Sequence, residues 1–151
     1  EMDDFSAKPG EPNLYGLIGG EANAIEPNKR MLSSMTPTIV LNNEKLFMVL
    51  GSPGGSTIIT SVFQNILNVV EHDMTMQESV NAKRFHHQWL PDEIVYEKNA
   101  FTEETKKQLT KLGYTLKERT AIGRVDAILI RNDGKLEGAA DPRGDDKAMG
   151  Y

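Results

Sequence analysis

Hydrophobic and β-branched residues form two short runs near the middle of the chain, at 38–41 and 45–50. The residues between them, 42–44, have the composition of a tight turn, so the two runs predict a β-hairpin. Because both runs are almost continuously apolar, we expect the hairpin to be covered on both faces.

A longer apolar pattern follows at helical spacing and predicts a helix over 58–70. Its opposite face is polar but carries no charge before Glu71, with side chains Thr60, Ser61, Gln64, Asn65 and Asn68. An uncharged polar face favours a helix packed between layers over one lying on the surface.

The rest of the chain alternates between short elements of both kinds. We expect helices at 76–85 and 102–113 and strands at 93–97, 115–119, 125–131 and 135–140. Thr102 is suited to cap the second of these helices and Gly113 to end it. The sequence Asn-Asp-Gly between the last two strands predicts a hairpin turn. This order indicates an α+β domain with strands stacked against helices.

Residues 1–30 lack such periodicity and are rich in glycine, proline and asparagine. An irregular stretch of this length in a compact domain is usually functional or disordered.

Composition fits one globular domain: 151 residues, of which 38% are hydrophobic and 26% charged. The net charge of −5 and the scattered basic residues argue against a nucleic-acid partner. Without cysteine there is neither a disulfide nor thiolate chemistry. Apolar runs stay below the roughly 18 residues of a membrane span. A signal peptide is not evident, and since the first residue is not methionine, we interpret the sequence as a processed chain or a fragment.

A glycine-rich stretch, Gly51-Ser52-Pro53-Gly54-Gly55-Ser56, joins the second predicted strand to the long helix. Lysine is missing from it and its glycine spacing is not that of a dinucleotide fingerprint, so phosphate binding has little support. Paired glycines at a helix start can present two N–H groups to one oxygen. A tight connection that needs glycine dihedrals is an equally good interpretation.

Two further clusters have both a functional and a structural interpretation. Ser33 and Ser34 could bind a carboxylate, although a turn is the better interpretation of these residues alone. The acidic residues Glu1, Asp3 and Asp4 lie beside Phe5 and could hold an ammonium group, although a solvated terminus is the simpler interpretation.

Other catalytic arrangements find no support. His86 and His87 are adjacent and so lack the i, i+4 spacing of a helical metal pair, and Glu71-His72-Asp73 gives no spaced ligand set. A G-x-S-x-G motif for a serine nucleophile is missing. We therefore expect no metal and no cofactor.

Taken together, several runs change this picture: MDDFSAKPG, PNLYGLIGG, NKRMLSSMTPTIV, GSPGGS, RFHHQWLPDE and DPRG. In this order and over the whole chain, the sequence resembles the C-terminal part of the small subunit of γ-glutamyltranspeptidases (glutathione hydrolases), especially the bacterial ones. The resemblance implies part of an N-terminal-nucleophile hydrolase fold, an αββα sandwich, with 1–30 as the rim and lid of the pocket.

The resemblance also implies a reaction. In the family a precursor cleaves itself, and the new N-terminal threonine of the small subunit attacks the γ-carbonyl of glutathione or another γ-glutamyl amide. The γ-glutamyl group then passes to water or to an amino-acid or peptide acceptor. The partner is the large subunit of the same precursor, and the location of bacterial members is periplasmic or secreted.

Residue by residue, the resemblance assigns Asp4 and the neighbouring position Glu1 to the substrate ammonium group, and Ser33 and Ser34 to its α-carboxylate. It assigns Gly54 and Gly55 to the oxyanion hole. Tyr15 falls in the lid segment of bacterial members.

The family's nucleophilic threonine lies upstream of the MDDF run, so we expect this chain to be inactive alone. Two other functions stay open: a related acylase or capsule-polymer transpeptidase on the same scaffold, and a non-catalytic amino-acid-binding fragment.

Overall fold

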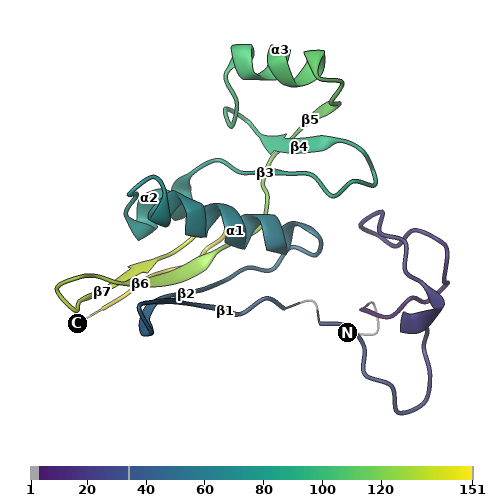
Figure 1. The fold of residues 1–151 in the computed structure, drawn as a ribbon, viewed down its shortest axis with the longest axis horizontal. Coiled ribbons are helices and arrows are strands. Elements are labelled where there is room, and N and C mark those ends of the chain that lie inside the picture. Colours follow the sequence, from purple (N-terminus) through teal and green to yellow (C-terminus); the bar gives the residue numbers. More distant parts are fainter. Residues whose placement is uncertain (1–3, 34, 151) are drawn as a thin grey trace.

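The computed structural model describes residues 4–33 and 35–150. Its larger part is a four-stranded antiparallel sheet with two helices on one face (Figure 1). The sheet has the order β1-β2-β6-β7, built from β1 (Thr38–Asn42), β2 (Lys45–Gly51), β6 (Asp126–Ile130) and β7 (Leu136–Ala139). Both predicted hairpins are present, since β1 pairs with β2 and β6 with β7.

The hydrophobic core lies between this sheet and the helices α1 (Thr57–Val70) and α2 (Met76–Asn81). Alternate residues of the strands point inward, among them the fully buried Met48 and the neighbouring Leu50 and Ala127. They meet apolar side chains of both helices: Ile58, Val62, Val69, Met76 and Val80. This is the layered α+β arrangement that the pattern predicts.

The outer face of the same sheet has a row of apolar side chains at matching register. Ile39 pairs with Val49, and Val49 pairs with Ile128. These three side chains are 67%, 38% and 45% exposed. The prediction that the first hairpin is covered on both faces therefore holds, within this chain, for one face only.

Helix α1 buries a stripe that includes the polar residues Ser61 and Asn65, both fully buried. The Ser79 hydroxyl of α2 donates to the Asn65 side-chain and backbone oxygens, both at 3.0 Å. Ile59 and Phe63, in contrast, are 71% and 57% exposed. The polar face is thus packed between elements as expected, but part of the apolar pattern faces outward.

A second sheet has the order β3-β4-β5, from β3 (Phe85–His86), β4 (Ile94–Glu97) and β5 (Leu116–Arg119). Helix α3 (Glu103–Lys111) connects the parallel strands β4 and β5. Thr102 caps this helix by accepting a hydrogen bond from the Thr105 N–H, and Gly113 follows it with φ +97°. Both end signals of this helix are therefore confirmed.

The prediction of a single helix over 76–85 is wrong in its second half. Helix α2 has a capping box at Thr75 but ends at Asn81, and Ala82 is extended with ψ 144°. From Phe85 the chain pairs with β4 instead. The reason is Arg84, whose buried side chain turns back to the Val80 carbonyl and closes the end of the helix.

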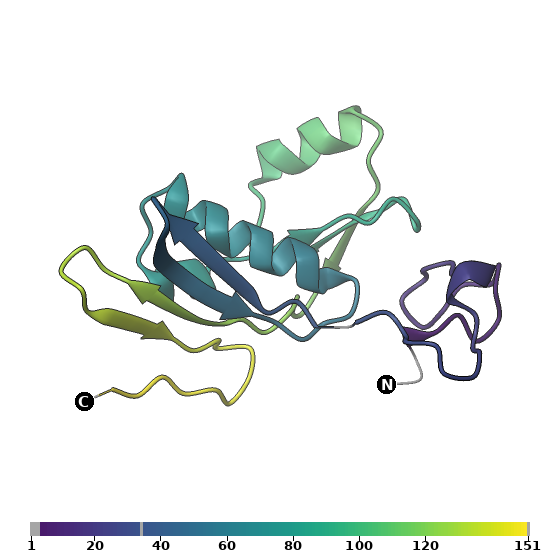
Figure 2. The same cartoon turned by 60° about the horizontal axis from the view of Figure 1, so that its bottom comes forward.

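The segment 4–33 lies at one end of the molecule, beside the start of α1 (Figure 2). It holds a 3₁₀ turn, Glu21–Asn23, and isolated bridges between Ser6 and Ala24 and between Pro12 and Ile18. Within the described ranges, no helix is long and apolar enough to cross a membrane.

Candidate functional site

The glycine loop, residues 51–56, connects β2 to α1 and places two consecutive glycines at the start of the helix. Gly54 has φ +140° and Gly55 has φ +59°, conformations that other residues rarely adopt. Space is also limited: a Cβ atom on Gly54 would lie 2.7 Å from the Thr57 hydroxyl oxygen, and one on Gly55 would lie 2.5 Å from the Tyr15 ring. Both positions therefore require glycine.

The N–H groups of Gly54 and Gly55 have no hydrogen-bond acceptor among the described residues. Gly54 is exposed and Gly55 half-buried, so a ligand can approach them. The start of α1 adds the positive end of its dipole. Open donors at such a position are suited to bind an oxyanion or a carboxylate.

Tyr15 lies over this loop, in contact with Gly55. It belongs to a tight turn in which the Asn13 side-chain oxygen accepts hydrogen bonds from the N–H groups of Tyr15 and Leu17, at 2.9 and 3.0 Å. Gln88, after β3, donates to the Tyr15 carbonyl at 2.8 Å. Tyr15 and Gly55, which the family resemblance assigns separately to the lid segment and to the oxyanion hole, thus lie in contact although they are far apart in the sequence.

A cavity of about 390 Å³ opens beside the loop. Leu14, Tyr15 and Gly54 line one side, and His86, Lys117 and Arg119 line the side formed by the second sheet. Its volume is that of a pocket for a small molecule. Glu93 also lines it and pairs with Lys117 at 3.1 Å, so Arg119 is the basic lining residue without an ion pair among the described residues.

The loop also rests on the segment 122–125. Ser52 accepts a hydrogen bond from the Arg124 N–H at 3.0 Å. Gly123, with φ +64°, lies against Gly54, and a Cβ atom there would be 2.9 Å from the Ser52 hydroxyl oxygen. This segment was not among the residues that the sequence singled out, because a lone glycine gives no motif.

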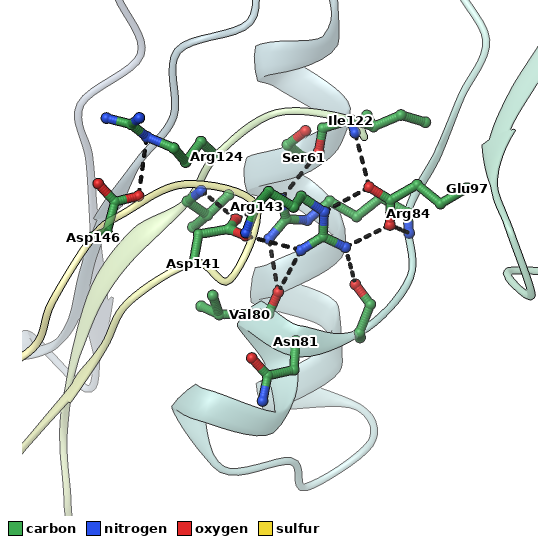
Figure 3. Close-up of polar contacts among 12 residues, drawn as sticks. Ser61, Val80, Asn81, Arg84, Glu97, Ile122, Arg124, Asp141, Arg143 and Asp146 are labelled. Atoms are coloured by element: carbon green, nitrogen blue, oxygen red, sulfur yellow. Dashed lines mark hydrogen bonds and ion pairs between the residues drawn. The ribbon is translucent and has the colours of Figure 1, made fainter. Parts of the chain in front are cut away.

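A cluster of four buried charges holds the segment 122–125 in place (Figure 3). The charge cluster consists of Arg84, Glu97, Asp141 and Arg143. Glu97 accepts the Ile122 N–H at 2.8 Å, and Asp141 accepts the Val125 N–H at 2.7 Å. The two amides that flank Gly123 and Arg124 are therefore each bound to a buried carboxylate.

Arg84 and Arg143 complete the charge cluster. Arg84 pairs with Asp141 at 2.8 Å and also donates to the Ile122 carbonyl at 3.0 Å. Arg143 pairs with Asp141 at 3.0 Å and forms a bidentate ion pair with Glu97. Both arginines also donate to the Val80 carbonyl at the end of α2.

Burial by itself raises the pKa of Glu97 and of Asp141. For Glu97, hydrogen bonds from Arg143 and from the N–H groups of Arg84 and Ile122 outweigh this effect and lower the pKa below its ordinary value. For Asp141, the N–H groups of Val125 and Arg143 and then the Arg84 charge do the same. Both carboxylates are therefore charged at neutral pH.

The charge cluster could not be predicted from the sequence. Asp141 and Arg143 lie in the DPRG run and Arg84 at the start of RFHHQWLPDE, but neither run has periodicity or ligand spacing that pairs them. Glu97 belongs to a predicted strand and looks like an ordinary surface residue.

The other predicted site residues are not joined to the glycine loop by any contact among the described residues. The Asp4 carbonyl accepts a hydrogen bond from Asn23 at 2.7 Å. The Ser33 hydroxyl is exposed and accepts from the Met35 N–H at 3.1 Å, which is a local turn. Glu1 and Ser34 lie outside the described residues.

The histidines have local partners. His86 bonds to Thr60 and Gln88, both at 2.8 Å, and His87 bonds to Asp92 at 2.9 Å. No group of three metal-ligating side chains is found within the part of the chain that the structure describes.

Comparison with known proteins gives consistent matches. The family model for gamma-glutamyltranspeptidase matches residues 1–151. A glutathione hydrolase proenzyme of Escherichia coli K12 is 53% identical over 152 residues, which cover 100% of this chain and 26% of the relative. The chain thus spans about a quarter of the length of this curated relative.

Solved structures agree in fold. The T380A mutant of the Helicobacter pylori gamma-glutamyltranspeptidase has a TM-score of 0.90 at 56% identity, over 95% of this chain and 79% of that chain. The Bacillus anthracis transpeptidase CapD has a TM-score of 0.71 at 23% identity, over 83% of this chain and 75% of that chain, which is a likeness of fold alone. The expected N-terminal-nucleophile hydrolase fold is therefore confirmed.

Proposed function

The chain belongs to the γ-glutamyltranspeptidase family, and we propose that it is the part of the small subunit that binds and polarises the γ-glutamyl group. The whole enzyme cleaves the γ-glutamyl amide of glutathione and related compounds and transfers the γ-glutamyl group to water or to an amino acid or peptide. The observation that carries this proposal is the pair of open N–H groups at Gly54 and Gly55 under Tyr15.

The two N–H groups are the oxyanion hole. When a nucleophile adds to the γ-carbonyl, negative charge develops on its oxygen, and two donors at the start of α1 stabilise this charge more than the uncharged carbonyl. The nucleophile is the N-terminal threonine of the family, supplied by the part of the small subunit outside this sequence. Its own amine takes the proton from its hydroxyl.

Recognition of the substrate falls to the segment before β1. Asp4 and Glu1 pair with the α-ammonium group, and Ser33 and Ser34 donate to the α-carboxylate. Ser33 is exposed and only locally bonded, so its hydroxyl is free to turn toward a ligand. An α-linked peptide has no free carboxylate at this position and leaves these donors unpaired, which explains the preference for γ-linked substrates.

Tyr15 acts as a lid. Its ring contacts Gly55, and its turn is held at one point by Gln88, so it covers the side of the loop where the oxyanion forms. Closure over the bound γ-glutamyl group limits its exposure to bulk solvent, and opening admits the acceptor, which is water or an amino acid.

The partner is the large subunit of the same precursor. The row Ile39, Val49 and Ile128 is an apolar sheet face that this chain leaves exposed. In an αββα sandwich, such a face packs against a second sheet. We assign the second sheet to the remainder of the precursor, and we place the mature heterodimer in the periplasm or outside the cell.

The test uses the full-length, self-processed protein and two chromogenic substrates, a γ-glutamyl and an α-glutamyl anilide. We expect release of the chromophore from the γ-isomer alone, and loss of this activity in Asp4→Ala. Asp3→Ala is the matched control, because it removes a neighbouring acid to which no role is assigned.

Two results would contradict the proposal. Cleavage of neither isomer, or a neutral Asp4→Ala, would favour the related function of an acylase or capsule-polymer transpeptidase on this scaffold. Turnover by the isolated chain of residues 1–151 would show that the nucleophile is not where the family places it.

A further inference from the structure

Two hydroxyl groups, one within the glycine loop and one directly after it, donate hydrogen bonds to backbone carbonyls of the loop. They belong to Ser52, before the glycines, and Thr57, the first residue of α1. We propose that these two side chains are positioning residues that fix and polarise the two oxyanion-binding N–H groups. The inference rests on the proposed function, in which Gly54 and Gly55 stabilise the oxyanion.

The first hydroxyl holds the peptide unit that contains the Gly54 N–H. Ser52 donates a hydrogen bond to the Pro53 carbonyl at 2.7 Å. This carbonyl and the Gly54 N–H belong to one planar peptide unit and point in opposite directions when the bond is trans. A bond that fixes the oxygen therefore also fixes the direction of the N–H. It also polarises the unit, because hydrogen bonds in series strengthen one another.

The second hydroxyl holds the next unit in the same way. Thr57 Oγ1 donates to the Gly54 carbonyl at 2.9 Å, and the Thr57 N–H donates to the same oxygen at 3.2 Å. The Gly54 carbonyl shares its peptide unit with the Gly55 N–H. Both oxyanion donors therefore have a hydroxyl group bonded at the opposite end of their peptide unit.

These bonds differ from N-capping, in which a hydroxyl accepts a hydrogen bond from an N–H of the first turn, because both hydroxyls here donate to carbonyls of the loop. The Thr57 bond is of the kind that helical threonines make to the carbonyl three residues back, as Thr60 also does, but at Thr57 the carbonyl belongs to the peptide unit of the Gly55 N–H. The residue at the cap position of α1 is Ser56, and its side chain makes no capping bond.

The Ser52 hydroxyl is itself oriented by a backbone N–H of the segment 122–125. It accepts the Arg124 N–H at 3.0 Å, which leaves its own hydrogen for the Pro53 carbonyl. The segment that presents Arg124 is held by Glu97 at Ile122 and by Asp141 at Val125. The charge cluster thus holds the backbone on both sides of Arg124, and the Arg124 N–H in turn orients the Ser52 hydroxyl that bonds to the Pro53 carbonyl.

The experiment compares Ser52→Ala, Thr57→Val and the double variant with the parent in the full-length, self-processed enzyme. The kinetic readout is kcat and KM for a γ-glutamyl anilide. Two inhibitors distinguish substrate binding from stabilisation of the tetrahedral intermediate. Norvaline has the α-ammonium and α-carboxylate groups but no γ-oxygen. A glutamate analogue with a boronic acid at the γ-position forms a tetrahedral adduct.

We expect kcat to fall about tenfold in each single variant, the size of one lost hydrogen bond, and further in the double variant. The Ki of the boronic acid should rise by a similar factor, and the Ki of norvaline should change by less than about twofold, since only the adduct uses the oxyanion donors. Thr57→Ser keeps the hydroxyl and should stay within about threefold of the parent.

Ser61→Ala is the matched control. Ser61 lies on the same helix and is fully buried, but its hydroxyl oxygen has no hydrogen-bond partner among the described residues. It should have the activity of the parent.

The proposal is wrong if Ser52→Ala and Thr57→Val both keep the kcat and the boronic acid Ki of the parent. It is also wrong if the Ki values of norvaline and of the boronic acid rise equally, because this would indicate a general loss of structure. Should Thr57→Val fail to mature, the half-buried Ser52 decides the question through Ser52→Ala. If the parent does not cleave the γ-glutamyl anilide at all, it is the proposed function that fails first, and this inference fails with it.

Discussion

The glycine loop and the charge cluster both contact the segment 122–125, but they differ in whether their polar groups have hydrogen-bond partners. In the cluster, both carboxylates and both guanidinium groups form ion pairs, with Arg84 Nε the one guanidinium nitrogen lacking a partner among the described residues, and all four side chains are at most 8% exposed. In the loop, two N–H groups have no acceptor within the described residues although the structure places them at a helix start. The comparison separates a polar network whose groups bond to one another from N–H groups that are open to a ligand, as the proposed function requires.

The two carboxylates of the charge cluster, Glu97 and Asp141, have lowered pKa values but are not available for proton transfer. A buried carboxylate with a lowered pKa is often a sign of an active site. Here Glu97 and Asp141 have such pKa values because arginines and backbone N–H groups saturate them, which leaves neither one free to exchange a proton with a substrate. At Glu97 and Asp141, the lowered pKa therefore reflects their support of the segment 122–125.

The largest expected effect comes from breaking the charge cluster. Asp141→Asn removes the charge that pairs with both arginines and should lower the free energy of unfolding by about 3–5 kcal/mol, the cost of leaving buried charges without their partner. Urea unfolding of the full-length protein, followed by tryptophan fluorescence, measures it. Glu103→Gln, in the exposed pair with Lys106, is the control and should cost less than about 0.5 kcal/mol. Equal effects of the two substitutions would show that the cluster is not what holds this region.

A smaller effect should follow from acid. Because the folded pKa values of Glu97 and Asp141 are lowered, their stabilisation is complete above the ordinary carboxyl pKa of about 4 and is lost as the pH falls through the folded values. The stability difference between the parent and Asp141→Asn should therefore shrink below about pH 4. Urea midpoints of both proteins between pH 7 and pH 3 test this, and a difference independent of pH would contradict it.

The smallest effect concerns the lid. Gln88→Ala removes the hydrogen bond to the Tyr15 carbonyl, worth about 1 kcal/mol, together with the bonds of Gln88 to His86 and to the Leu90 carbonyl. It should loosen the turn around Tyr15 more than any other part of the chain. Amide hydrogen exchange of the full-length protein should then be faster at residues 13–17 and unchanged in α1. Gln64→Ala, which removes bonds to the Phe85 backbone away from the lid, is the comparison variant. Unchanged exchange in Gln88→Ala would mean that other contacts hold the lid.

Much of the fold could be predicted from local signals. Both hairpins, α1 and α3 follow from apolar spacing, turn residues and a capping threonine, because these elements are set by neighbours in the sequence. The end of α2 could not be predicted in this way, since it depends on Arg84 turning back to Val80 within a buried cluster. Nor could the outward position of Ile59 and Phe63, because periodicity does not tell which of two apolar stripes finds a partner in the chain.

In the candidate site, too, residues with a local sequence signal could be predicted and residues placed by long-range contacts could not. The paired glycines could be singled out from the sequence, and Tyr15 from the family resemblance. Ser52, Gly123 and the charge cluster could not, because their roles depend on contacts between residues far apart in the chain, such as Val125 with Asp141 and Arg124 with Ser52, which are 16 and 72 positions apart. Hydroxyl groups in a loop have no sequence signature that distinguishes a bond to a backbone carbonyl from exposure to water.

The bond from the Val125 N–H to Asp141 has a consequence for the order of events during biosynthesis. A ribosome that has released the glycine loop and α1 has not yet made the carboxylate that holds the segment on which the loop rests. The site can therefore take its final shape only after residues 141–143 have been translated.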